Sequence, residues 1–240
     1  RRSAIGTPRV TPAPPPPAPT ADREVPASTP PTARTLHRAR GAGYPDHREG
    51  PWPEPSPTGA QPLTTVVSFH GFASGPQGPS PKTDLIRDLG YAVALIATDG
   101  DYRPAGYRAA FARLGLDPAA PVVLMGTSLG GFWARRLGQE LGRPWLALNP
   151  AIQPSVTLRR YLGPHTRFDT GGAFVWTAAD CAAYVAEEHF PLRPDVPGLL
   201  ICAADDEVLD YRVARDAAAT AQVLVLPGGG HQLHNTGDYG

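Results

Sequence analysis

Residues 126–130 read Gly-Thr-Ser-Leu-Gly, and this stretch decides the fold that we expect. An apolar run, Pro-Val-Val-Leu-Met, precedes it at residues 121–125, and Phe-Trp-Ala-Arg-Arg-Leu follows at residues 132–137. The order predicts a strand, a sharp turn and a helix, which is the setting in which a G-x-S-x-G motif holds a nucleophile. Such a turn strains the backbone of its central residue, and the flanking glycines permit close packing. We therefore predict that Ser128 is exposed at the end of a strand, beside the free N–H groups of a helix N-terminus.

Other apolar runs share the character of the strand before Ser128. They lie at residues 64–69, 91–97, 144–148, 199–203 and 222–226. Their near-continuous apolar character is typical of a parallel sheet that is buried on both faces. Longer amphipathic stretches predict helices at residues 82–89, 105–114, 131–141 and 211–220. The alternation predicts a three-layer α/β fold, with a mostly parallel sheet, helices on both faces and chemistry at the carboxyl ends of the strands.

The composition divides the chain near residue 60. Fifteen of its 30 prolines fall within residues 1–60, where aliphatic residues are few. Such a segment buries too little apolar surface to offset the entropy of ordering, so we predict a disordered, Pro-rich N-terminal segment at residues 1–60. Residues 61–240 are predicted to form one α/β domain.

Charge and cysteine content limit the classes of partner and compartment. The 22 basic and 22 acidic residues balance, which argues against nucleic-acid binding. No stretch of 7–15 apolar residues follows the first two arginines, and no run approaches the ~20 apolar residues of a membrane span, so neither a secretory signal nor a membrane span is expected. Cys181 and Cys202 are too few for a disulfide framework, and we expect a cytoplasmic location.

A nucleophilic serine needs a histidine as its base. His231 ends a glycine-rich loop after the last predicted strand, where its imidazole can reach the sheet edge, and His234 is the alternative. His70 follows the first predicted strand directly, and we interpret it as a residue that shapes this loop.

The base needs an acid to orient it. Residues 203–210, after the strand predicted at 199–203, read Ala-Ala-Asp-Asp-Glu-Val-Leu-Asp. We predict Asp206 as the acid, since the apolar pair that follows Glu207 can pack the loop against the domain and fix the direction of the Asp206 carboxylate. Asp205 is the alternative, or it caps the loop backbone, and Asp210 is well placed to cap the next helix. Some hydrolases carry the acid after the preceding strand, but here that position holds Asn149, which is uncharged.

Backbone N–H groups complete the predicted site. One donor is the N–H of Leu129, the residue after the nucleophile, and Phe72 in the loop after the first strand is our choice for the second. The order Ser128, Asp206, His231 along the chain is that of α/β-hydrolases.

A set of motifs resembles the YqiA-type esterases, which are small single-domain bacterial α/β-hydrolases. The motifs are His70-Gly71-Phe72, Gly126-Thr127-Ser128-Leu129-Gly130-Gly131, Leu148-Asn149-Pro150-Ala151, Tyr161-Leu162-Gly163, Asp206-Glu207-Val208-Leu209-Asp210-Tyr211-Arg212 and Gly229-Gly230-His231. The resemblance covers residues 64–234 and implies a cytoplasmic esterase, active on acyl esters or acyl thioesters, whose nucleophile, acid and base are Ser128, Asp206 and His231. Asp205 stands where the family tends to have glycine, and the Pro-rich extension is not a family feature.

These observations predict a metal-independent serine hydrolase that needs no cofactor and acts on a small carboxylic ester or thioester. An acyltransferase would use the same three residues. A further alternative is a hydrolase-fold protein whose Pro-rich segment binds a protein partner. Residues 152–197 are too few for a large lid, and their aromatic residues either line an acyl pocket or pack in the core. These aromatic residues are Tyr161, Phe168, Phe174, Trp176 and Tyr184.

Overall fold

The computed structural model describes residues 64–77 and 80–233. The predicted Pro-rich segment at residues 1–60 lies outside the described residues. The division into residues 1–60 and 61–240 therefore stays a prediction.

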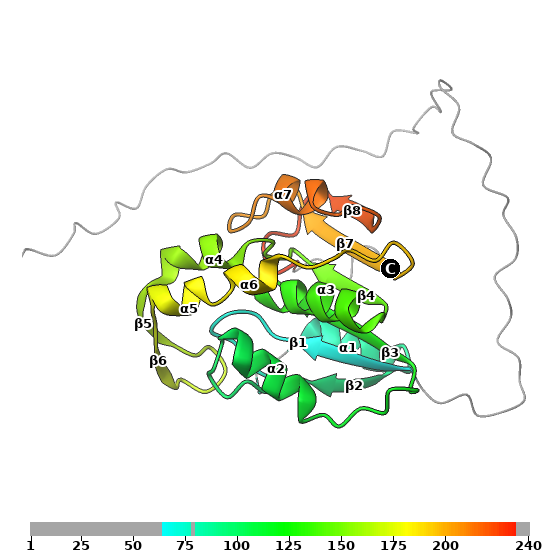
Figure 1. Ribbon diagram of the computed structural model, residues 1–240, viewed down its shortest axis with the longest axis horizontal. Helices are drawn as coiled ribbons and strands as arrows, with labels where there is room; N and C mark the ends of the chain where they lie inside the picture. The colour runs from blue at the N-terminus through cyan, green and yellow to red at the C-terminus, as the bar shows by residue number, and fades with distance from the viewer. Residues whose placement is uncertain (1–63, 78–79, 234–240) are drawn as a thin grey trace, which may run out of the picture. The chain divides into compact units, whose positions relative to one another are not determined.

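Six parallel strands form the central sheet, and each lies where the sequence predicts one (Figure 1). They are β1 (Thr65–Phe69), β2 (Ala92–Leu95), β3 (Val122–Thr127), β4 (Trp145–Leu148), β7 (Gly198–Ala203) and β8 (Gln222–Leu226). Their spatial order is β2-β1-β3-β4-β7-β8, and every pair of neighbours is parallel. The predicted parallel α/β fold is confirmed.

Four helices connect these strands: α1 (Pro81–Asp88), α2 (Pro104–Ala112), α3 (Leu129–Leu141) and α7 (Tyr211–Asp216). The helices lie on both faces of the sheet: Figure 1 shows α2 and α3 in front of it and α1 behind. Among the described residues, no helix has the length and apolar character that crossing a membrane requires.

Helix α7 begins as predicted but ends early. The Asp210 side chain accepts the N–H of Arg212 at 2.9 Å and caps its first turn. The helix stops at Asp216 instead of residue 220, because the chain turns into β8. Ala219 takes a positive φ of 53° in that turn.

The segment from residue 152 to 197, which we call the cap segment, consists of short elements. These are α4 (Pro154–Thr157), the 3₁₀ helix η1 (Leu158–Tyr161), the antiparallel pair β5 (Gly163–Thr166) and β6 (Ala173–Trp176), α5 (Ala178–Ala182) and α6 (Val185–Glu188). Figure 1 shows α4, α5 and the β5–β6 pair at the end of the sheet toward which β1 points. The predicted minimal lid is thus a small cap at the carboxyl ends of the strands.

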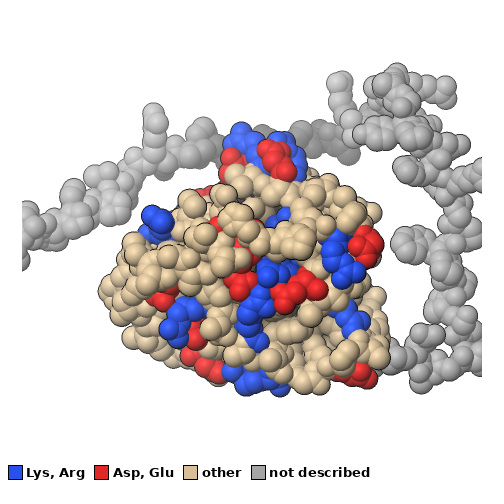
Figure 2. Space-filling view, in the orientation of Figure 1, with Lys and Arg blue, Asp and Glu red and all other residues tan. Residues whose placement is uncertain are grey.

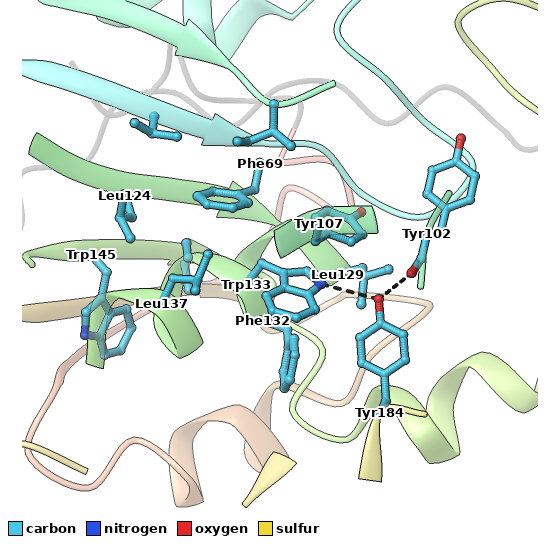
Figure 3. Packing of buried hydrophobic residues seen from close by; sticks show 14 of the residues in the cluster. Phe69, Tyr102, Tyr107, Leu124, Leu129, Phe132, Trp133, Leu137, Trp145 and Tyr184 are labelled. Carbon is cyan, nitrogen blue, oxygen red and sulfur yellow. Dashed lines mark hydrogen bonds between the residues drawn. The ribbon is translucent and has the colours of Figure 1, made fainter. Parts of the chain in front are cut away.

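Aromatic residues join α3 to the cap segment. Trp133 of α3 is fully buried, stacks on Tyr107 with ring centroids 5.3 Å apart, and donates its indole N–H to the Tyr184 hydroxyl at 3.3 Å. The Tyr184 hydroxyl donates to the carbonyl of Tyr102, as Figure 3 shows. Because α3 begins at Leu129, directly after the predicted nucleophile, this packing fixes that residue relative to the cap.

Ion pairs tie the outer surfaces of the helices together. Arg108 of α2 contacts Glu187 of α6 at 2.6 Å and Glu140 of α3 at 3.0 Å. Figure 2 shows acidic and basic side chains next to one another across this face. Such mixed charge gives this face no broad basic surface of the kind that binds nucleic acids.

Candidate active site

Ser128 occupies a sharp elbow between β3 and α3. Its φ of 58° and ψ of −122° are strained for a residue with a side chain. The Ser128 N–H donates to the Leu148 carbonyl at 2.9 Å, which anchors the elbow to the end of β4.

The elbow packs too closely for side chains at two of its glycines. A Cβ atom at Gly126 would lie 2.2 Å from the Gly130 carbonyl oxygen, and one at Gly130 would lie 2.1 Å from the carbonyl oxygen of Phe69. Real Cβ atoms do not approach backbone atoms so closely. The glycines of the motif therefore let α3 start directly against β1 and β3.

His231 and Asp206 contact each other beside this elbow. His231 Nδ1 lies 2.9 Å from Asp206 Oδ2 and 3.0 Å from Oδ1. Burial alone would raise the pKa of Asp206, but hydrogen bonds from His231 and from the N–H groups of Leu209 and Val208 hold it below its ordinary value. An ionised Asp206 favours the imidazole tautomer with its proton on Nδ1, which leaves Nε2 free to accept a proton.

The neighbouring carboxylates hold the backbone of the histidine loop. Asp205 Oδ1 accepts the N–H of Gly230 at 2.9 Å, and Glu207 Oε2 accepts the N–H of His231 at 3.0 Å. Of the two adjacent aspartates, Asp206 is therefore the one that contacts the imidazole, and Asp205 caps the loop. His234, the alternative base, lies outside the described residues.

Ser128 and His231 line one cavity of about 500 Å³. In the described part of the chain, no hydrogen bond joins Ser128 Oγ to His231; such bonds are often long in the absence of substrate. Tyr161 and Phe168 of the cap segment line this cavity too. The other cap aromatics pack elsewhere: Trp176 and Tyr184 are buried in the core, and Phe174 packs against it.

The two predicted oxyanion donors border the same cavity. Leu129 is the first residue of α3, so its N–H has no partner within the helix. The Phe72 N–H takes part in none of the backbone hydrogen bonds within residues 64–77 and 80–233. The Phe72 ring is held by Tyr161 and Trp176, with centroids 5.5 and 5.0 Å away, and this packing fixes the direction of the loop.

His70 lies on the other side of that loop. Its Nδ1 donates to the Gly71 carbonyl at 2.9 Å, and its Nε2 accepts from the Thr98 hydroxyl at 3.1 Å. Burial lowers the pKa of His70 below its ordinary value of 6.5. A neutral imidazole that makes two hydrogen bonds and does not line the cavity fits the predicted role in shaping the loop.

Residues 65–239 match the model of a family described as "Uncharacterised protein family (UPF0227)". The chain belongs to this family. The resemblance to YqiA-type α/β-hydrolases, predicted from the motifs, is confirmed. UPF0227 thus accounts for the α/β domain, and the predicted Pro-rich segment lies outside the matched residues.

Solved structures share the fold of this UPF0227 member. Mouse alpha/beta hydrolase domain-containing protein 10 is 18% identical over 72% of this chain and 84% of its own, with a TM-score of 0.58. The esterase domain of a Rhodothermus marinus protein is 20% identical over 75% of this chain and 82% of its own, with a TM-score of 0.53. Est1E from Butyrivibrio proteoclasticus is 16% identical over 71% of this chain and 80% of its own, with a TM-score of 0.50. The neighbours confirm the α/β-hydrolase fold.

Sequence reasoning missed the part that Asn149 plays in the site. Its side chain is almost fully buried, and its Nδ2 donates to the carbonyls of Gly230 and His231, both at 2.9 Å. Its Oδ1 accepts the N–H of Ala203, at the end of β7, at 2.8 Å. Asn149 therefore joins the ends of β4 and β7 to the loop that carries the imidazole. The position after β4 is visible in the sequence, but these contacts span 54 to 82 residues.

Neither cysteine competes with Ser128 as a nucleophile. Cys181 and Cys202 are buried free thiols, and burial raises the pKa of Cys202 to about 11. Its thiolate is therefore scarce at neutral pH. Within the described ranges, no group of three or more His, Cys, Asp or Glu side chains is arranged to hold a metal ion.

Proposed function

We propose that this protein is a serine hydrolase that cleaves carboxylic esters or acyl thioesters through Ser128, His231 and Asp206. The observation that carries the proposal is the 2.9 Å contact between His231 Nδ1 and Asp206 Oδ2 beside a strained Ser128 that lines the same cavity as His231. A nucleophile, a base and an orienting acid in this relation make up the unit used for acyl transfer.

In the proposed reaction, His231 Nε2 takes the hydroxyl proton as Ser128 Oγ attacks the substrate carbonyl. The N–H groups of Phe72 and Leu129 stabilise the negative oxygen of the tetrahedral intermediate. The imidazolium passes its proton to the leaving alcohol or thiol, which departs and leaves the acyl group on Ser128. His231 then activates water, which releases the acid and restores the serine.

The test is the hydrolysis of p-nitrophenyl butyrate by the full chain and by Ser128→Ala. Because loss of the nucleophile in a triad removes nearly all catalysis by that triad, we expect turnover to fall at least about 10³-fold with the fold unchanged by circular dichroism. Full activity in Ser128→Ala would refute the assignment.

The same acyl-enzyme could pass its acyl group to an alcohol or an amine instead of water. Product analysis with and without an added acceptor separates the two outcomes, and we expect the free acid to dominate. The predicted cytoplasmic location belongs to this proposal too, since the described cysteines are free thiols. Partner binding by residues 1–60 stays a prediction.

A further inference from the structure

The cavity beside Ser128 combines apolar walls with a single permanent cation. Leu158, Tyr161, Val208 and Leu209 supply apolar surface, and Arg160 supplies a guanidinium. Of the described residues that line this cavity, none is an aspartate or a glutamate. An apolar cavity with one charged group favours a ligand that pairs an apolar stretch with the opposite charge.

Two backbone carbonyls hold Arg160 in η1. Its Nε donates to the Thr157 carbonyl and its Nη1 donates to the Val208 carbonyl, both at 3.1 Å. The guanidinium carbon lies 5.8 Å from the centre of the Tyr161 ring. These contacts orient the guanidinium but do not neutralise its charge.

Several arginines of the domain are neutralised by a carboxylate, whereas Arg160, like Arg135, Arg143 and Arg159, binds backbone carbonyls only. Arg108, Arg136 and Arg167 each contact a carboxylate. Across residues 64–77 and 80–233, Arg160 forms no ion pair, and its Nη2 makes no hydrogen bond. A guanidinium with free donors matches the geometry of a carboxylate or a phosphate.

We propose that Arg160 selects esters that carry an anionic group, a carboxylate or a phosphate. The inference rests on the proposed hydrolase function. The anion binds the free donors of Arg160 while the scissile carbonyl lies against Ser128, and the apolar walls contact the chain between the two groups. Neutral esters of the same length enter the cavity without this contact and react more slowly.

The experiment compares kcat/KM for two matched pairs of substrates. Monomethyl adipate against methyl hexanoate tests a carboxylate in the acyl part, and 2-acetoxyethyl phosphate against 2-tert-butoxyethyl acetate tests a phosphate in the alcohol part. The variants are Arg160→Gln, Arg160→Lys and the control Arg159→Gln, whose arginine is adjacent in η1 but does not line the cavity. Released acid is measured by chromatography.

In at least one pair, we expect the wild type to prefer the anionic ester. Arg160→Gln should lower kcat/KM for that ester about tenfold or more, which corresponds to ~1.4 kcal/mol, and should change the neutral ester less than about twofold. Arg160→Lys should recover part of the preference, because it keeps the charge but not the fork of donors. Arg159→Gln should change neither ester by more than about twofold.

Three results would overturn the inference. These are a wild type that prefers the anionic ester in neither pair, an equal loss for both esters in Arg160→Gln, and the same loss of preference in Arg159→Gln. An equal loss would mean that Arg160 only ties η1 to the loop of Asp206. The failure of the proposed hydrolase function is seen separately, as unchanged hydrolysis of methyl hexanoate by Ser128→Ala.

Discussion

Replacing Asn149 with alanine should loosen the loop that carries His231. The substitution removes three hydrogen bonds, to Ala203, Gly230 and His231. At roughly 1 kcal/mol each, they sum to about 3 kcal/mol of the free energy of unfolding. The φ of 40° at this position, which asparagine tolerates better than alanine, adds to the loss. Domains of this kind are stable by only about 5–15 kcal/mol, so the change is large.

The effect on activity follows from the position of the imidazole. A shift of about 1 Å in a catalytic group can lower the rate about 10²-fold, and we expect kcat to fall by about that factor in Asn149→Ala. Urea denaturation gives the stability, and hydrolysis of p-nitrophenyl butyrate by the folded enzyme gives kcat.

Two further variants separate the contacts that hold the histidine loop. Asn149→Asp keeps an acceptor for the Ala203 N–H but loses both donors to the histidine loop, so its kcat should also fall. Asp205→Asn keeps an acceptor for the Gly230 N–H and should change kcat little. If Asn149→Ala kept both the wild-type stability and the wild-type kcat, the amide would not hold the loop. A loss of stability alone would show that it does not position His231.

Other expectations test the remaining parts of the site. Asp206→Asn should lower kcat about 10⁴-fold, as loss of the orienting carboxylate does in a serine triad, while Asp205→Asn stays within about threefold; equal losses would contradict the choice of acid. Both Ser128→Ala and Ser128→Gly remove the hydroxyl, but only glycine adopts the strained backbone of the elbow without cost. Ser128→Gly should therefore be more stable in urea than Ser128→Ala by about 0.5–2 kcal/mol. Equal stability of the two variants would argue against strain. Burial lowers the pKa of His70, so the unfolded chain binds more protons below pH 6.5, and stability should fall as the pH drops below that value by up to about 1.4 kcal/mol per pH unit. Urea titrations at pH 7.5 and 5.5 should show a smaller fall in His70→Gln, and an identical fall would exclude His70 as its source.

The sequence predicted the sheet well, because each strand is a short apolar run that can be recognised without knowledge of the segments that pack against it. The elbow at Ser128 was equally visible, since its G-x-S-x-G motif lies between an apolar run and a helical stretch. The contact that requires Gly126 is with nearby Gly130, but the one that requires Gly130 is with distant Phe69. The position of His231 followed from its place after the last strand. The order of motifs along the chain was therefore enough to choose most of the proposed site residues.

Contacts between distant segments could not be predicted in this way. Asp205 and Asp206 are adjacent carboxylates, and only the fold shows which one contacts His231. The cap segment was predicted as a whole but not in its elements, because pieces such as β5, Gly163–Thr166, are too short to show a period. Arg160 lines the cavity and binds the carbonyls of Thr157 and of Val208, which lies 48 residues away.

The most direct test of the central claim is covalent labelling of the nucleophile. A fluorophosphonate should modify one residue of the full chain, and peptide mass spectrometry should find the adduct on Ser128. Ser128→Ala should stay unlabelled, and Asp206→Asn should be labelled more slowly than the wild type. An adduct on another residue, or labelling of Ser128→Ala at the wild-type rate, would contradict Ser128 as the nucleophile.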